Sequence, residues 1–158
     1  MNTVLKWSVI LVAVVTLMNL IIIGTGLHTN PIAGSLFVVL ALVFNITALI
    51  MLLRETRADC GYGKQLLNSI LLGLIAGVLI FATSFLVLSV LFPNSIPEMI
   101  DGNIAFLASA PIDDAARQAQ IAAVQGTTAM TQSLSGLMGT FFTSLLVGAI
   151  LAIFLRKK

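Results

Sequence analysis

Four long apolar stretches, separated by polar links, occupy most of this chain of 158 residues. A helix needs about 20 apolar residues to cross the hydrocarbon core of a bilayer, and each stretch is at least that long. None of them alternates in hydropathy with a period of two residues, as the strands of a membrane barrel do. The sequence therefore predicts an all-α integral membrane protein, a four-helix bundle with spans at about residues 7–27, 32–53, 66–92 and 134–155.

The composition extends this prediction to the whole chain. Hydrophobic residues make up 59% of it and charged residues 9%, which leaves too little polar surface for a soluble domain. The first stretch is not followed by a small-residue cleavage site, and His28 to Pro31 lead directly into the second stretch. Residues 1–158 are therefore expected to form a single transmembrane domain that keeps its first helix.

The basic residues predict the orientation. Seven of the eight lie before the first span, between the second and third, or after the fourth: Lys6, Arg54, Arg57, Lys64, Arg156, Lys157 and Lys158. Since cytoplasmic loops carry an excess of Lys and Arg, both termini are expected in the cytoplasm and residues 93–133 on the other side. The net charge is only +2, and the basic residues are distributed over these links and do not form one basic face, so no nucleic-acid partner is indicated.

Small residues predict how the spans pack. They recur every four positions in the last span, and a shorter series lies in the third; the two series are Gly136, Thr140, Ser144, Gly148 and Ala152, and Ser69, Gly73 and Gly77. Such ridges let two helix backbones approach closely. The preferred interpretation is that the third and fourth spans pack together within one chain, and a homodimer seam is the alternative.

Two asparagines, Asn19 and Asn45, are the strongest polar groups inside the spans. An unpaired amide at that depth is costly, so each is expected to find a partner across a helix interface, as structural glue or, alternatively, as part of a binding site. No Asp, Glu, Lys, Arg or His lies within the four predicted spans. Proton relays and ion-coupled carriers use such groups, so their absence argues against a proton-coupled transporter.

The sequence offers no set of residues for catalysis or for a cofactor. It has one cysteine, Cys60, and one histidine, His28, so neither a Ser-His-Asp triad nor a clustered metal site can be assembled. His28 is interpreted as a loop residue, because no second ligand is evident. We therefore expect a protein without catalytic activity, metal or cofactor.

The region between the third and fourth spans, about residues 94–130, predicts two short extracytoplasmic helices that form an outer cap. Ser95 and Glu98 have the spacing of a capping box, and apolar residues at helical spacing follow them. Asp113 and Asp114 suit the first turn of a second helix, which ends near Gln125. The charged residues of this cap are Glu98, Asp101, Asp113, Asp114 and Arg117. They form either a solvated lid or a docking surface for a partner.

The order of these features resembles a known family. Arg54 to Arg57, the Gly61–Lys64 turn, a glycine-containing third span, a polar helical pair beginning near Pro93 and a last span ending in three basic residues are similar to the DUF4199 family of small bacterial inner-membrane proteins. The resemblance implies a multi-pass protein of the bacterial inner (plasma) membrane and supplies no activity. Members often carry an acidic residue and a proline in the last span; residues 141–148 here keep Gly148 and lack both.

Three functions remain open. The preferred hypothesis is a structural or accessory subunit that binds another membrane protein, or a second copy, through the small-residue faces and the cap. The first alternative is a small oligomeric transporter or channel. The weaker alternative is a lipid- or quinone-binding protein that uses aromatic residues in the outer halves of the third and fourth spans, namely Phe81, Phe85, Phe92, Phe141 and Phe142.

Overall fold

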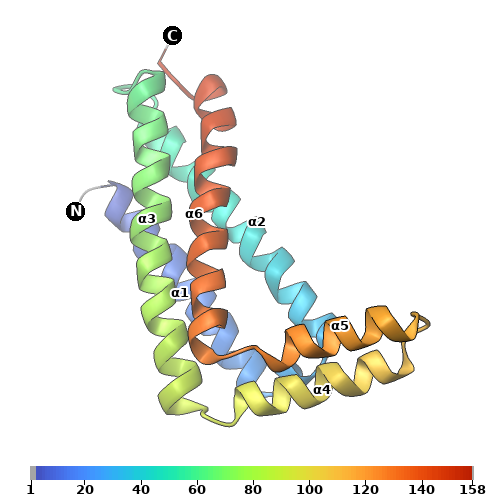
Figure 1. Ribbon diagram of the computed structural model, residues 1–158. Coiled ribbons are helices and arrows are strands. Elements are labelled where there is room, and N and C mark those ends of the chain that lie inside the picture. Colours follow the sequence, from blue (N-terminus) through green and yellow to red (C-terminus); the bar gives the residue numbers. More distant parts are fainter. Residues whose placement is uncertain (1–2, 158) are drawn as a thin grey trace.

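The computed structural model describes residues 3–157, and every element in that range is helical (Figure 1). The elements in chain order are α1 (Thr3–Gly24), η1 (Leu27–Thr29), α2 (Pro31–Glu55), α3 (Tyr62–Leu86), η2 (Val87–Leu91), α4 (Ser95–Ser109), α5 (Asp114–Gln125) and α6 (Ala129–Phe154). Segment η1 is a single 3-10 turn, and η2 is a π-helical turn that continues α3. The predicted all-α fold, with four long apolar helices and two short ones between the third and fourth, is confirmed.

The four long helices have the length and composition of membrane spans. The third span runs through α3 and η2, from Tyr62 to Leu91. The mean hydropathy of the most apolar 18-residue window lies between 2.2 and 2.8 in all four spans. The protein is therefore a multi-span membrane protein. We call the end of the bundle that carries η1, α4 and α5 the cap end. The opposite end, which carries the first turns of α1, the α2–α3 link and the last turns of α6, is the terminal end (Figure 1).

Helices α3 and α6 run side by side along the bundle (Figure 1). Small residues make this approach close: a methyl group added at Gly73 would lie 2.6 Å from Ser144 Cβ, and one added at Gly148 would collide with Ser69. Gly77 faces the backbone of Leu137. Two pairs of small residues from the predicted ridges, Gly73 with Ser144 and Ser69 with Gly148, thus face each other across one seam within the chain, the α3–α6 seam.

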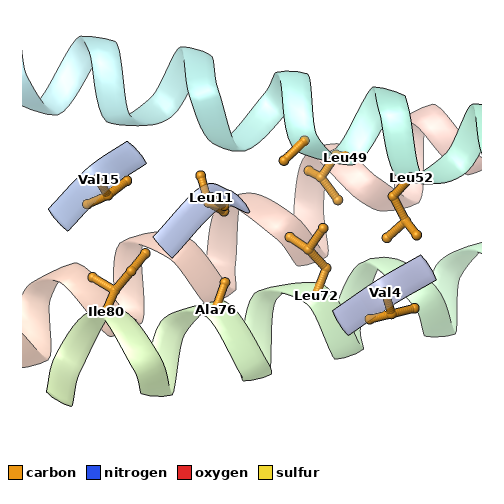
Figure 2. Close-up of a cluster of buried hydrophobic side chains, with 9 residues drawn as sticks. Val4, Leu11, Val15, Leu49, Leu52, Leu72, Ala76 and Ile80 are labelled. Atoms are coloured by element: carbon orange, nitrogen blue, oxygen red, sulfur yellow. The ribbon is translucent and has the colours of Figure 1, made fainter. Parts of the chain in front are cut away.

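A core of packed apolar side chains joins α1, α2 and α3. Figure 2 shows these side chains pointing toward one another, and the buried set is Val4, Leu11, Val15, Ala48, Leu49, Leu52, Leu72, Ala76 and Ile80. Lipid tails are as apolar as these side chains, so dispersion contacts and close packing, rather than escape from water, stabilise the cluster. All the α2 members lie in its half near the terminal end.

One buried glutamine fastens the terminal end. Gln65 Nε2 donates hydrogen bonds to the carbonyl oxygens of Leu53 and Leu155, each at 2.9 Å, and its Oε1 accepts one from the Thr56 hydroxyl at 2.8 Å. The side chain is fully buried. It therefore ties the end of α2, the start of α3 and the end of α6 together, which fixes these three helices at the terminal end.

The cap is a hairpin of α4 and α5 that lies across the cap end (Figure 1). Helix α4 approaches η1 so closely that a methyl group at Gly102 would collide with the carbonyl of Thr29. The predicted capping box of Ser95 and Glu98 is wrong: the Ser95 hydroxyl donates to the Phe92 carbonyl, and no side chain caps α4 at Asn94. Glu98 instead contacts His28, because η1 packs beside the first turns of α4.

Candidate functional site

Helix α2 diverges from α6 toward the cap end (Figure 1). Its five buried residues all lie between Asn45 and Leu53, and none lies in the half from Pro31 to Phe44. The half near the terminal end is therefore packed into the bundle, whereas the half near the cap end lines a space between the spans.

Asn45 marks the point where packing ends. Its side-chain Nδ2 donates to the Thr140 carbonyl at 3.2 Å, and its Oδ1 accepts a hydrogen bond from the Ser144 hydroxyl at 3.1 Å. The amide is 4% exposed, so both bonds are made within the bundle. Asn45 thus attaches α2 to α6 at about mid-span, as a cross-helix partner was expected to do.

A cavity of about 380 Å³ occupies the space between this attachment and the cap end. Its walls come from α1, α2, α3 and α6, and α4 closes it at the cap end. The apolar residues of the lining are Leu11, Val15, Ile22, Ile23, Phe37, Val38, Ala41, Leu42, Ile80, Leu88, Ile96 and Met99. Ligand pockets in proteins typically measure about 300–1,000 Å³ and have mostly apolar walls, so the cavity has the size and character of one.

The cavity opens sideways toward the membrane. Val38 and Leu42 on α2 and Gly139 on α6 belong to its lining and are exposed. All three lie well inside apolar spans, so the opening faces hydrocarbon. A molecule that enters here would come from the bilayer.

The depth of the cavity matches one leaflet. Leu11 and Ile23 on α1 both line it, and at about 1.5 Å per helical residue they lie about 18 Å apart along the helix. The hydrocarbon core of a bilayer is about 30 Å thick, so this path reaches from the cap-end interface to the middle of the membrane.

Three glycines belong to the cavity lining: Gly34, Gly136 and Gly139. Additional methyl groups at Gly34 of α2 and Gly139 of α6 would have no neighbour within 4 Å, and one at Gly136 would touch only Ile80. Gly136 was predicted to belong to the packing ridge, and its contact with Ile80 is at ordinary distance, 3.4 Å. These positions therefore differ from the glycines of the α3–α6 seam, whose missing side chains allow helix packing.

The other two members of the predicted ridge in α6 have separate environments. Thr140 lines the cavity and offers its carbonyl to Asn45. Ala152 is fully buried near the terminal end. The ridge is thus a packing surface over part of its length and a cavity wall near the cap end.

The two asparagines differ in environment. Asn19 lines the cavity, and its amide makes no hydrogen bond within residues 3–157, unlike that of Asn45. The expected cross-helix partner is therefore found for Asn45 and not for Asn19 among the described residues. An amide without a protein partner at this depth is a polar group that a bound molecule can satisfy.

His28 and Glu98 meet at the cap end of the cavity. His28 Nε2 lies 2.9 Å from Glu98 Oε2, and the histidine side chain is 10% exposed against 54% for the glutamate. His28 lines the cavity and also a smaller recess of about 230 Å³ beside it. No sequence pattern indicates this pairing, since 70 positions separate the two residues.

The other charged cap residues have local roles. Asp113 Oδ1 accepts from the Ala116 amide and caps α5. Arg117 pairs with Asp114 and donates to three backbone carbonyl oxygens, which holds the α4–α5 hairpin together; the carbonyls are those of Leu107, Ala110 and Ile112. Asp101 is exposed. The structure brings Glu98 to the recess beside the cavity and keeps Asp113, Asp114 and Arg117 on the cap itself.

Neither metal ligands nor the predicted aromatic cluster form this site. Within residues 3–157, no group of three or more His, Cys, Asp or Glu side chains is placed to hold a metal ion. The aromatic residue of the lining is Phe37 on α2, and none of the five phenylalanines named for a lipid or quinone site belongs to it. No sequence signal marks Phe37 and its neighbours as cavity-lining residues, since lipid-facing and protein-facing positions of a span are equally apolar.

Comparison with known proteins identifies a family. No curated protein and no solved structure matches the chain. The family model for DUF4199, described as a protein of unknown function, matches residues 6–157, which cover the cap and all four spans apart from the first three residues of α1. The chain therefore belongs to the DUF4199 family.

Proposed function

We propose that this protein is a non-catalytic membrane protein that holds the hydrocarbon chain of a membrane amphiphile in the cavity between α2 and α6. The observation that carries the proposal is the divergence of α2 from α6 between Asn45 and the cap end, which leaves an apolar cavity open to the bilayer within an otherwise packed bundle. A gap of this kind between spans would be filled by lipid.

The shape of the cavity supports a single chain as its occupant. Its path is about one leaflet deep, and its closed end at Asn45 lies near the middle of the membrane. Its apolar walls suit methylene groups, and polar groups gather at the cap end around His28 and Ser95. An amphiphile would enter with its chain toward Asn45 and its head toward the cap.

The distribution of basic residues supports an orientation for the site. Arg54, Arg57 and Lys64 all lie at the terminal end. Because cytoplasmic loops carry an excess of Lys and Arg, this distribution favours a cytoplasmic terminal end. The cavity would then lie in the outer leaflet of a bacterial inner membrane.

A role as an accessory subunit has less support than the sequence suggested. Gly73 and Gly148 are already covered by Ser144 and Ser69 of the same chain, so the α3–α6 seam offers no small-residue face to a partner. A partner helix could instead pack on the exposed apolar face of α2 beside the cavity opening, where Val38 and Val39 lie. A helix of another membrane protein in this position is therefore the competing outcome of the test below.

Photolabelling in proteoliposomes tests the proposal. The probe is an uncharged single-chain amphiphile, hexadecan-1-ol with a diazirine halfway along its chain, and the labelled peptides are identified by mass spectrometry. We expect labelling of the lining residues Phe37 to Leu42 and of the α6 segment around Gly139. Substitution Gly139→Trp should fill the opening and reduce this labelling several-fold, whereas labelling around the lipid-facing Ile150, 59% exposed, should not change.

Substitution Gly139→Ala provides the matched control, because it changes the same helix position and leaves the cavity open. Equal labelling of the cavity segments in the Trp and Ala variants would contradict the proposal. Crosslinks from those segments to another protein, in place of lipid, would favour the accessory role.

A further inference from the structure

The apolar cavity adjoins a second, polar hollow at the cap end. This recess of about 230 Å³ shares Ile23, His28 and Ser95 with the cavity. Its other lining residues are Leu91, Phe92, Pro93, Asn94 and Glu98. The three shared residues form a partition between a space that faces hydrocarbon and a space at the membrane boundary, which is where the head of an amphiphile would lie.

The hydrogen bonds of the partition leave one buried atom without a partner. The Ser95 hydroxyl donates to the Phe92 carbonyl at 2.7 Å, and His28 Nε2 contacts the Glu98 carboxylate at 2.9 Å. His28 Nδ1 is shut off from solvent and has no hydrogen-bond partner in the part of the chain that the structure describes. A buried polar atom that lacks a partner is destabilising, so a ligand that supplies one gains affinity.

The glutamate determines what His28 can offer. An ionised carboxylate only accepts hydrogen bonds, so Nε2 must carry the hydrogen that lies between the two groups. In the neutral ring the other nitrogen, Nδ1, then carries a lone pair and acts as an acceptor. The partner that suits this atom is a hydroxyl donor.

The charges at the cap end disfavour an anionic head. None of the described residues that line the cavity or the recess is Lys or Arg. Arg117, the one basic residue between the third and fourth spans, is engaged by Asp114 and three backbone carbonyls. The Glu98 carboxylate faces the recess and would repel a phosphate or a second carboxylate.

We infer that the ligand is a neutral lipid with a free hydroxyl head, such as a long-chain alcohol or a prenyl alcohol, whose hydroxyl donates to His28 Nδ1 after a small shift of the ring opens that atom to the cavity. Glu98 is the positioning residue that holds the ring and its tautomer. This inference rests on the proposed function, since it assigns the head of the molecule whose chain fills the cavity.

Competition among three single-chain compounds tests the head group. A diazirine analogue of hexadecan-1-ol is the photoprobe, and hexadecan-1-ol, its methyl ether and hexadecyl phosphate are the competitors in proteoliposomes. The ether keeps the chain and loses the hydroxyl donor. We expect it to compete about fivefold less well than the alcohol, because one net hydrogen bond changes the affinity by roughly that factor. The phosphate should compete less well than the alcohol because of Glu98.

Variants of His28 separate recognition from folding. Substitution His28→Asn retains a side-chain polar atom near the position of Nδ1, whereas His28→Leu retains none. We expect His28→Asn to keep part of the preference for the alcohol over the ether and His28→Leu to abolish it. Glu98→Gln should reduce the preference as well, because an amide can also donate to Nε2 and no longer fixes the tautomer. A preference unchanged in all three variants would overturn the role of His28.

The outcomes distinguish the two proposals. If labelling by the alcohol probe is lost in Gly139→Trp but the ether competes as well as the alcohol in the wild-type protein, the cavity binds chains and the assignment of the head is wrong. If Gly139→Trp labels like the wild type, both proposals are wrong.

Discussion

The Ser144 hydroxyl donates a hydrogen bond to the Asn45 side chain, with 3.1 Å between Ser144 Oγ and Asn45 Oδ1. Asn45 in turn donates to the carbonyl of Thr140, one helical turn earlier in α6. These bonds join α2 to α6 where the two helices begin to diverge. They set the closed end of the cavity, and Gln65 fixes the same helices at the terminal end.

Substitution Asn45→Leu should lower the free energy of unfolding by about 1 kcal/mol, which is within the usual range for hydrogen bonds between membrane helices. The measurement is unfolding by sodium dodecyl sulfate in mixed micelles. Asn19→Leu is the control, because the Asn19 amide makes no hydrogen bond within residues 3–157. Similar losses in both variants would show that the bonds of Asn45 do not anchor α2.

Substitution Gly148→Ala should destabilise the α3–α6 seam, since the new methyl group collides with Ser69. Overpacking of this kind costs about 1–3 kcal/mol. Adding Ser69→Gly should recover much of the loss, because it removes the colliding side chain, and a double-mutant cycle measures this coupling. Gly139→Ala, with open space at its methyl group, should be neutral or stabilising. Purely additive effects of the two seam substitutions would contradict the described packing.

Substitution Gly102→Ala should loosen the cap from η1, because its methyl group meets the Thr29 carbonyl. Faster amide hydrogen exchange in α4 is the expected observation. Gly126→Ala is the control: it lies at the end of α5, where an added methyl group has only ordinary contacts at 3.6 Å and beyond. Unchanged exchange in Gly102→Ala would mean that α4 does not need this close approach.

Substitution Arg117→Lys should open the α4–α5 hairpin although it keeps the charge. The guanidinium serves three carbonyl oxygens and Asp114 at once, and a lysine ammonium cannot reproduce that planar arrangement of donors. We expect faster proteolysis between Ser109 and Asp113 in Arg117→Lys and no change in Asp101→Asn, which alters an exposed charge. Equal resistance of Arg117→Lys and the wild type to protease would contradict this role.

The spans and the cap could be predicted from the sequence, because each depends on local properties. Apolar length defines the spans, and the break between Ser109 and Asp113 separates α4 from α5. The spacing of Gly73, Gly77 and Gly148 could suggest a close seam, but it could not decide between one chain and two. Only the three-dimensional arrangement shows which residues each glycine faces.

The cavity could not be predicted, because it arises from the relative tilt of two helices. Nothing in the composition of residues 31–44 distinguishes a helix half that packs on the bundle from one that leaves it, since lipid and protein interiors are equally apolar. The pairing of His28 with Glu98 depends on how η1 and α4 dock, which joins residues far apart in the chain. Local capping rules assigned Glu98 to its own helix instead.

Native mass spectrometry of the protein, extracted gently from its own membrane, tests the central claim most directly. The account predicts that the wild-type protein and Gly139→Ala retain a tightly bound lipid through detergent exchange, and that Gly139→Trp loses it while remaining folded. The account would be contradicted if Gly139→Trp retained the same lipid, or if the wild-type protein were detected only without bound lipid.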